Sequence, residues 1–207
     1  FQNLRITQIM RNFTLFVERF LARFKEKKGD PEAVNVATSD MIHGFRNAMN
    51  ECFPNAITTV DKFHVVSNCE DAVDRVRRRE AASGEKRKSK ALAKTKYIWL
   101  KNDENLTEKQ KKRLDELLQI EYLDTVKAYD MRLKLQDFYS KHDAYDEKTI
   151  FDFDNMALDF CNSTIGEMQK FGEMLVRNAV EILNYFETKR TNAILEGFNS
   201  KISVIKN

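Results

Sequence analysis

The chain has 207 residues and a net charge of +3, with 42% hydrophobic and 32% charged residues. This balance is typical of a soluble globular protein with one sizeable core, or with a domain that carries a large insertion. Charged residues interrupt the sequence too often for a membrane-spanning helix, and the first residues lack a signal-peptide pattern, so we expect a cytoplasmic protein with no membrane partner.

The first third of the sequence predicts alternating strands and helices. We expect strands at 4–10, 33–38 and 56–60, separated by helices at 13–27 and 41–52. This β-α-β-α-β order favours a parallel sheet with right-handed crossover connections.

After residue 61 the strand pattern disappears and only helices are expected. Thr107 is the predicted N-cap of one of them, with Gln110 at capping-box spacing. The segment 81–90 has the composition of a mobile loop. The predicted helices lie at 63–80, 91–102, 107–142, 147–162 and 165–188, with a final helix from about residue 192.

Positive charge gathers between residues 75 and 96. This stretch holds ten basic residues against two acids, Glu80 and Glu85, which gives it a local charge of +8. Such a block is typical of a surface that binds a polyanion such as DNA, although a solvated lysine-rich linker has the same composition. The residues that we expect to bind DNA here are Arg75, Arg77, Arg78, Arg79, Lys86, Arg87 and Lys88.

Two aromatic residues, Tyr97 and Trp99, lie close to the basic block in the sequence. Aromatic side chains beside cations can stack on nucleic-acid bases. The spacing of this pair with Leu100 on a predicted helix favours packing inside the protein instead.

Two acids, Asp40 and Asp61, each follow a predicted strand. Either one suits the N-cap of a following helix. The carboxyl ends of parallel strands, however, form the edge at which such sheets bind ligands. Carboxylates are the ligands that hold Mg²⁺ in phosphoryl transfer on DNA. His64 follows Asp61 by three residues and is expected either in a supporting position or packed as a neutral imidazole.

A second polar pattern lies near the C-terminus. Asn192, Glu196 and Asn199 fall at positions i, i+4 and i+7, on one face of a predicted helix, and Lys201 follows them. The pattern suits a metal-binding acid flanked by amides, with a lysine available to bind phosphate. A solvated polar face is the alternative.

Three segments in this order resemble the DDE transposases of bacterial insertion sequences, in particular the ISL-three family. They are S-D-M at 39–41, F-P-N-A at 53–56 followed by D-K-F-H-V at 61–65, and T-N-A-I-L-E-G-F-N-S-K-I at 191–202. The segments 72–78 and 97–102 are also similar to that family, so the resemblance covers nearly the whole chain.

The resemblance implies an α/β, helix-dominated fold. A partial ribonuclease-H-like (integrase-like) core is expected at 1–66, a large all-helical insertion at 67–190, and a returning catalytic helix at 191–207. The resemblance assigns Asp40 and Glu196 as catalytic, metal-binding carboxylates. The supporting residues that it implies are Asp61, His64, Asn192 and Asn199.

The implied function is DNA transposition by metal-dependent strand cleavage and strand transfer. Mg²⁺ or Mn²⁺ is the implied cofactor of the full-length protein, and DNA at the element ends and the target is the implied partner. The chain begins downstream of the family's first aspartate, so we expect it to be inactive alone. The alternative is a non-catalytic DNA-binding or helical protein-interaction module derived from a transposase. The oligomeric state stays open, with a homo-oligomer as one alternative.

Overall fold

The computed structural model describes residues 15, 17–39, 41 and 49–189. The chain divides into two compact units, one made of Phe1–His64 with Asn178–Asn207 and the other of Val65–Arg177. Within the described residues, no helix is both long enough and apolar enough to cross a membrane. The predicted strand at 4–10 and most of the predicted helix at 41–52 lie outside the described residues.

In the first unit, residues 17–26 form a helix that ends in a tight turn. Lys28 adopts a left-handed conformation with φ of 62°, and the Gly29 amide donates to the Phe24 carbonyl at 2.9 Å. A Cβ atom at Gly29 would lie 2.6 Å from the Phe24 ring, so this close approach requires glycine. The Phe24 ring packs edge-on against Phe53 with centroids 5.9 Å apart, which ties the helix to the segment that precedes the second strand.

The sheet of the first unit is a parallel pair, β1 (Val36–Ser39) and β2 (Ile57–Val60). The predicted parallel pairing is thus confirmed. β1 starts later than predicted, because Pro31–Ala33 first form a 3-10 helix, η1, capped by the Asp30 side chain.

Helix α10 (Ala179–Thr188) packs on β2 in the same unit. The Asn184 side-chain amide donates to the Thr58 carbonyl at 2.9 Å. In the other direction, the Thr59 hydroxyl donates to the Glu181 carbonyl at 3.3 Å. The strand therefore receives its helical cover from a segment more than a hundred residues further along the sequence.

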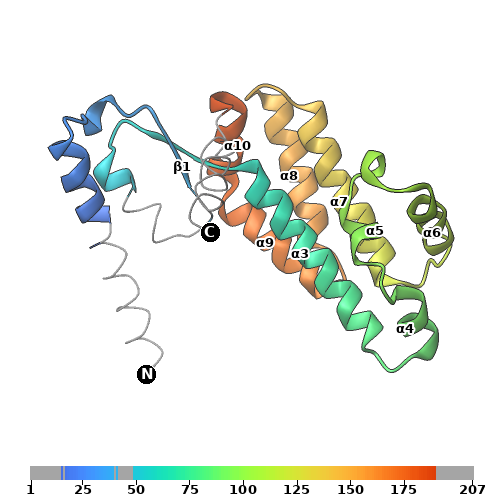
Figure 1. Ribbon diagram of the computed structural model, residues 1–207. Coiled ribbons are helices and arrows are strands. Elements are labelled where there is room, and N and C mark those ends of the chain that lie inside the picture. Colours follow the sequence, from blue (N-terminus) through green and yellow to red (C-terminus); the bar gives the residue numbers. More distant parts are fainter. Residues whose placement is uncertain (1–14, 16, 40, 42–48, 190–207) are drawn as a thin grey trace. The chain divides into compact units, whose positions relative to one another are not determined.

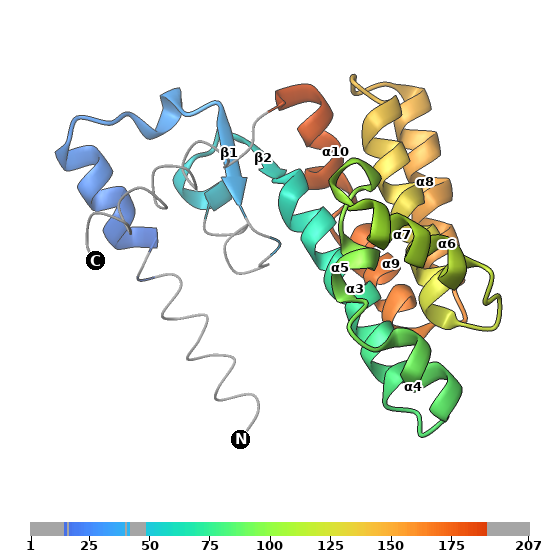
Figure 2. The same cartoon turned by 45° about the vertical axis from the view of Figure 1, so that its right-hand side comes forward.

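The second unit is helical throughout its described length. α3, α7, α8 and α9 run side by side in both views, and α4 lies beside the C-terminal end of α3 (Figures 1 and 2). The helices are α3 (Lys62–Ala81, residues 65–81 belonging to this unit), α4 (Lys86–Leu92), α5 (Lys96–Leu100), the 3-10 helix η2 (Asp103–Asn105), α6 (Glu108–Leu118), α7 (Asp124–Lys141), α8 (Glu147–Cys161) and α9 (Gly166–Arg177).

Helices α8 and α9 pack closely against each other. The Phe160 and Phe171 rings meet edge to face with centroids 5.0 Å apart. A Cβ atom at Gly172 would lie 2.5 Å from the Cys161 backbone nitrogen, so glycine lets the two helices approach closely here.

Three predicted helices are each broken into two in the structure. The one predicted at 91–102 breaks where Lys94 takes φ of 58°, and the loop predicted at 81–90 is helical from Lys86 onward. The helix predicted at 107–142 breaks at 119–123, and the one predicted at 165–188 breaks at Asn178. The capping box of Thr107 and Gln110 is present as predicted.

The side chain of Glu80 on α3 caps the N-terminus of α7. Its Oε1 accepts from the Asp124 amide at 3.0 Å, and its Oε2 accepts from the amide and the hydroxyl of Thr125, each at 2.7 Å. The N-cap residue of α7, Leu123, has no side chain that could serve this purpose. A buried carboxylate from another helix therefore satisfies the free amides at the start of α7 and complements its dipole.

Candidate functional site

The two strands of the sheet end in register, with Ser39 opposite Val60. In the sequence an aspartate follows each of these residues at once, Asp40 after β1 and Asp61 after β2. The Asp61 side chain is completely buried, and its Oδ1 accepts from the Phe63 amide at 3.0 Å. Asp61 therefore stabilises the start of α3, as an N-terminal carboxylate does. Asp40 lies outside the described residues.

His64 lies in the first turn of α3, three residues after Asp61, and is partly exposed. Its backbone amide donates to the Asp61 carbonyl at 3.0 Å. The D-x-x-H spacing thus places both residues in one helical turn, directly after the end of β2.

The other predicted residues of the catalytic site, Asn192, Glu196, Asn199 and Lys201, also lie outside the described residues. Their approach to the strand ends therefore stays a prediction. Across 17–39 and 49–189, no three His, Cys, Asp or Glu side chains gather closely enough to hold a metal ion.

Four of the cations predicted to bind DNA form ion pairs inside the second unit, and the most exposed of them, Arg78, pairs with Asp74. Arg77 is largely buried, lies 2.7 Å from Asp74 and donates to the Leu92 carbonyl. The remaining two are Arg79, which bridges Glu167 at 2.8 Å and Asp124 at 3.2 Å, and Lys88, which lies 3.1 Å from Glu85 and 4.0 Å from Glu80.

The Arg79 bridge is strong enough to affect the titration of its partner. Burial raises the pKa of the Glu167 carboxyl, but the hydrogen bond from Arg79 opposes it, and the net pKa is lowered from the ordinary value. We therefore assign Arg79 to holding α3, α7 and α9 together, because a phosphate could bind it only by displacing two carboxylates.

The other predicted cations face solvent. Arg75, Lys86 and Arg87 are exposed and form no ion pair with another described residue. Arg78 is 64% exposed although its Nε lies 3.1 Å from Asp74. Lys90 and Lys94 are exposed on the same α4–α5 segment. The basic block thus separates into cations that hold the fold and cations that are available to a ligand.

The backbone that carries the exposed cations of α4 is firmly held. Leu92 is completely buried, and its carbonyl accepts from the Thr95 hydroxyl at 2.7 Å. The neighbouring Ala91 carbonyl accepts from Arg113 of α6 at 3.1 Å. The composition of 81–90 suggested a mobile loop, whereas most of this charge lies on an anchored helix.

Replacing Arg79 by glutamine is expected to lower the melting temperature and to leave the DNA affinity of the folded protein nearly unchanged. The change removes the charge from a bridge between three helices, and pairs of this partly exposed kind contribute about 1 kcal/mol. Thermal unfolding and fluorescence anisotropy with a duplex measure the two effects. Arg75→Gln is the matched control, for which the opposite pattern is expected.

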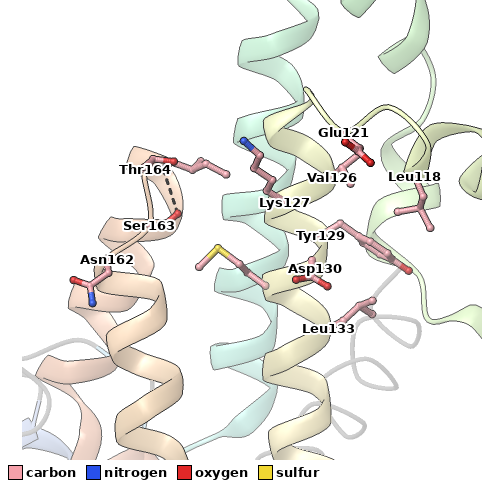
Figure 3. Close-up of a pocket in the computed structure, with 12 residues that line it drawn as sticks. Leu118, Glu121, Val126, Lys127, Tyr129, Asp130, Leu133, Asn162, Ser163 and Thr164 are labelled. Carbon is pink, nitrogen blue, oxygen red and sulfur yellow. Dashed lines mark hydrogen bonds between the residues drawn. The ribbon is translucent and has the colours of Figure 1, made fainter.

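An open cavity of about 680 Å³ lies in the second unit between α7 and the connection from α8 to α9 (Figure 3). Apolar side chains such as Leu118, Val126 and Leu133 make up much of its lining. Figure 3 places Lys127 of α7 across from Ser163 and Thr164 of the connection. The cavity lacks the convergent carboxylates that metal-dependent phosphoryl transfer needs among the described residues.

Comparison with known proteins identifies the family. Residues 11–207 match the family of transposases of the DDE ISL-three type. None of the curated proteins and none of the solved structures matches the chain. Because the matched region spans nearly all of the sequence, the chain belongs to the ISL-three family of DDE transposases.

Proposed function

We propose that the chain forms part of the centre that cleaves and rejoins DNA strands in transposition. Membership of a transposase family connects it with DNA transposition in general. The structural observation that carries the finer proposal is the matched ending of β1 and β2, with Ser39 opposite Val60 and an aspartate next in the sequence after each. Ligands of parallel sheets bind at such an edge.

In this proposal Asp40 and Glu196 are the carboxylates that bind Mg²⁺ or Mn²⁺. Divalent ions held in this way stabilise the charge on the attacking and leaving oxygens of a phosphoryl transfer. Asp61 suits a supporting role, since its buried carboxylate already accepts a hydrogen bond from the start of α3. His64, Asn192 and Asn199 complete the supporting residues.

The proposed fold around this centre is a partial ribonuclease-H-like core interrupted by a helical insertion. The parallel β1–β2 pair with α10 packed on β2 supports the core, and the all-helical composition of Val65–Arg177 supports the insertion. The resemblance assigns two catalytic carboxylates to this sequence, Asp40 and Glu196, and we propose that the chain does not cleave DNA with these two alone.

The proposed DNA contacts are the exposed cations of the second unit, Arg75, Arg78, Lys86 and Arg87, together with Lys201. The charge of the four cations in the second unit is not neutralised by a close carboxylate among the described residues, apart from the partly exposed pair of Arg78 with Asp74. Cations that release counterions from phosphates supply most of the affinity for DNA. Arg77, Arg79 and Lys88 act instead through the helices that they join.

Backbone cleavage by bound Fe²⁺ tests the metal site directly. Fe²⁺ replaces Mg²⁺ at carboxylate sites, and with ascorbate and peroxide it cuts the chain close to the ion. We expect cuts around residues 40, 61 and 196 in the same experiment. Asp40→Asn and Glu196→Gln should each remove the whole set, because neutral amides bind the ion much more weakly.

The control variant is Asp154→Asn, which changes an exposed carboxylate on α8 and should leave the cuts intact. Cuts near residue 40 without cuts near 196 would show that the two acids do not share an ion. That result, or cuts that persist in Glu196→Gln, would contradict the proposed centre and favour a non-catalytic DNA-binding module.

A further inference from the structure

Tyr97 of α5 is far more exposed than its position in the sequence predicts. Its side chain is 62% exposed, whereas Trp99, two residues later, is completely buried. Packing inside the protein was predicted for both rings, and it is confirmed for Trp99 and wrong for Tyr97. A short helix can bury only one of two residues that lie two positions apart, because they project in different directions.

The sequence that leads up to Tyr97 from Lys86 carries positive charge only. Between Lys86 and Tyr97 there are six cations and no carboxylate. The ammonium of Lys96 lies 5.7 Å from the centre of the Tyr97 ring, and Lys94 is exposed three residues before Tyr97. Lys94 and Lys96 form no ion pair with another described residue. The Tyr97 ring therefore lies beside positive charges that attract a polyanion.

The backbone that presents this ring is fixed by buried contacts. The Thr95 hydroxyl donates to the Leu92 carbonyl at 2.7 Å and accepts from the Trp99 indole nitrogen at 3.0 Å. The Trp99 ring in turn packs edge-on against Tyr129 of α7, with centroids 5.5 Å apart. Because Trp99 and Thr95 hold α5 in place, binding at Tyr97 requires little further ordering of the chain.

We propose that Tyr97 stacks on an unpaired base of DNA while Lys94 and Lys96 bind the flanking phosphates. The proposal rests on the proposed function, since it takes DNA as the ligand. Phosphate binding alone requires no exposed aromatic ring, whereas an unpaired base offers a face on which tyrosine stacks. Duplex DNA hides those faces, so the Tyr97 ring is selective for single-stranded or locally opened DNA.

The test compares two DNA forms and uses the full 207-residue chain. A fluorescent oligothymidine and a duplex of equal length are titrated, and binding is followed by anisotropy. Tyr97→Ala is expected to weaken binding of the single strand about tenfold and binding of the duplex less than about twofold. Tyr97→Phe should retain the wild-type affinity for the single strand, because the ring and not the hydroxyl stacks.

The matched control is Tyr145→Ala, which removes another exposed tyrosine, located in the connection between α7 and α8. It should leave binding of both forms unchanged. Equal losses for single strand and duplex in Tyr97→Ala, or no loss at all, would overturn the stacking proposal. Wild-type protein that binds neither form would instead contradict the proposed function. If the wild type binds duplex DNA and Tyr97→Ala changes neither affinity, the stacking proposal fails and the proposed function is retained. A melting curve for each variant confirms that it is folded.

Discussion

Replacing Lys86, Arg87 and Lys90 together by glutamate is expected to weaken binding of duplex DNA by about 100-fold at low salt. All three side chains are exposed on α4 and form no ion pair with another described residue. Lys86 and Arg87 are among the proposed phosphate contacts, and we expect Lys90 on the same helix to add another. Each reversal also adds a repulsive charge. The slope of log affinity against log salt should become shallower by about three, one for each lost contact.

A control variant with the same change in net charge separates the effect of the α4 surface from the effect of the protein's overall charge. Lys25, Lys127 and Lys170 are exposed cations on other elements, and their joint reversal should weaken binding several-fold at most. Anisotropy titrations at several salt concentrations measure both variants. If the two triple variants lose the same affinity, α4 makes no specific contribution and its cations are merely solvated.

Replacing Glu80 by alanine is expected to lower the free energy of unfolding by about 3 kcal/mol. The substitution leaves the Asp124 amide and both donors of Thr125 without their acceptor, and Thr125 is completely buried. Glu80→Gln should cost somewhat less, because it keeps one acceptor oxygen but turns an NH₂ group toward a backbone donor. Urea unfolding followed by circular dichroism gives the free energies.

Glu85→Ala is the matched control for this experiment. Glu85 is exposed and its closest partner is Lys88 at 3.1 Å, so its loss should cost less than about 0.5 kcal/mol. A Glu80 variant that is as stable as the Glu85 variant would show that water can replace the carboxylate at the start of α7.

Hydrophobic spacing predicted where the chain is helical but not where the long helices break. Apolar positions continue through 107–142 at helical spacing, while the break at 119–123 depends on Glu80, a residue about 40 positions earlier that caps α7. The break at Lys94 lies between two completely buried residues, Leu92 and Trp99. Tertiary contacts of this kind override local propensity, and one sequence does not reveal them.

For the basic block at 75–96, the sequence predicted the positive charge but not which cations pair with carboxylates and which remain exposed. The pairing of Arg77 with Asp74 is local, at i and i+3 on α3, and helical spacing could have revealed it. One partner of Arg79 is Glu167, 88 residues away, and no pattern along the chain connects them. At the proposed catalytic edge, the D-x-x-H element could be located from sequence alone because both residues lie in one turn.

The hydrogen bond between Asn184 and Thr58 joins residues 126 positions apart, and this separation has a consequence for synthesis on the ribosome. β2 receives its helical cover only after residues 179–188 have been made, whereas Val65–Arg177 is a compact helical unit of continuous sequence. The helical unit can therefore fold while the nascent chain is still growing. The β1–β2 sheet cannot complete its packing until α10 has emerged from the ribosome, and until then β2 lacks its helical cover.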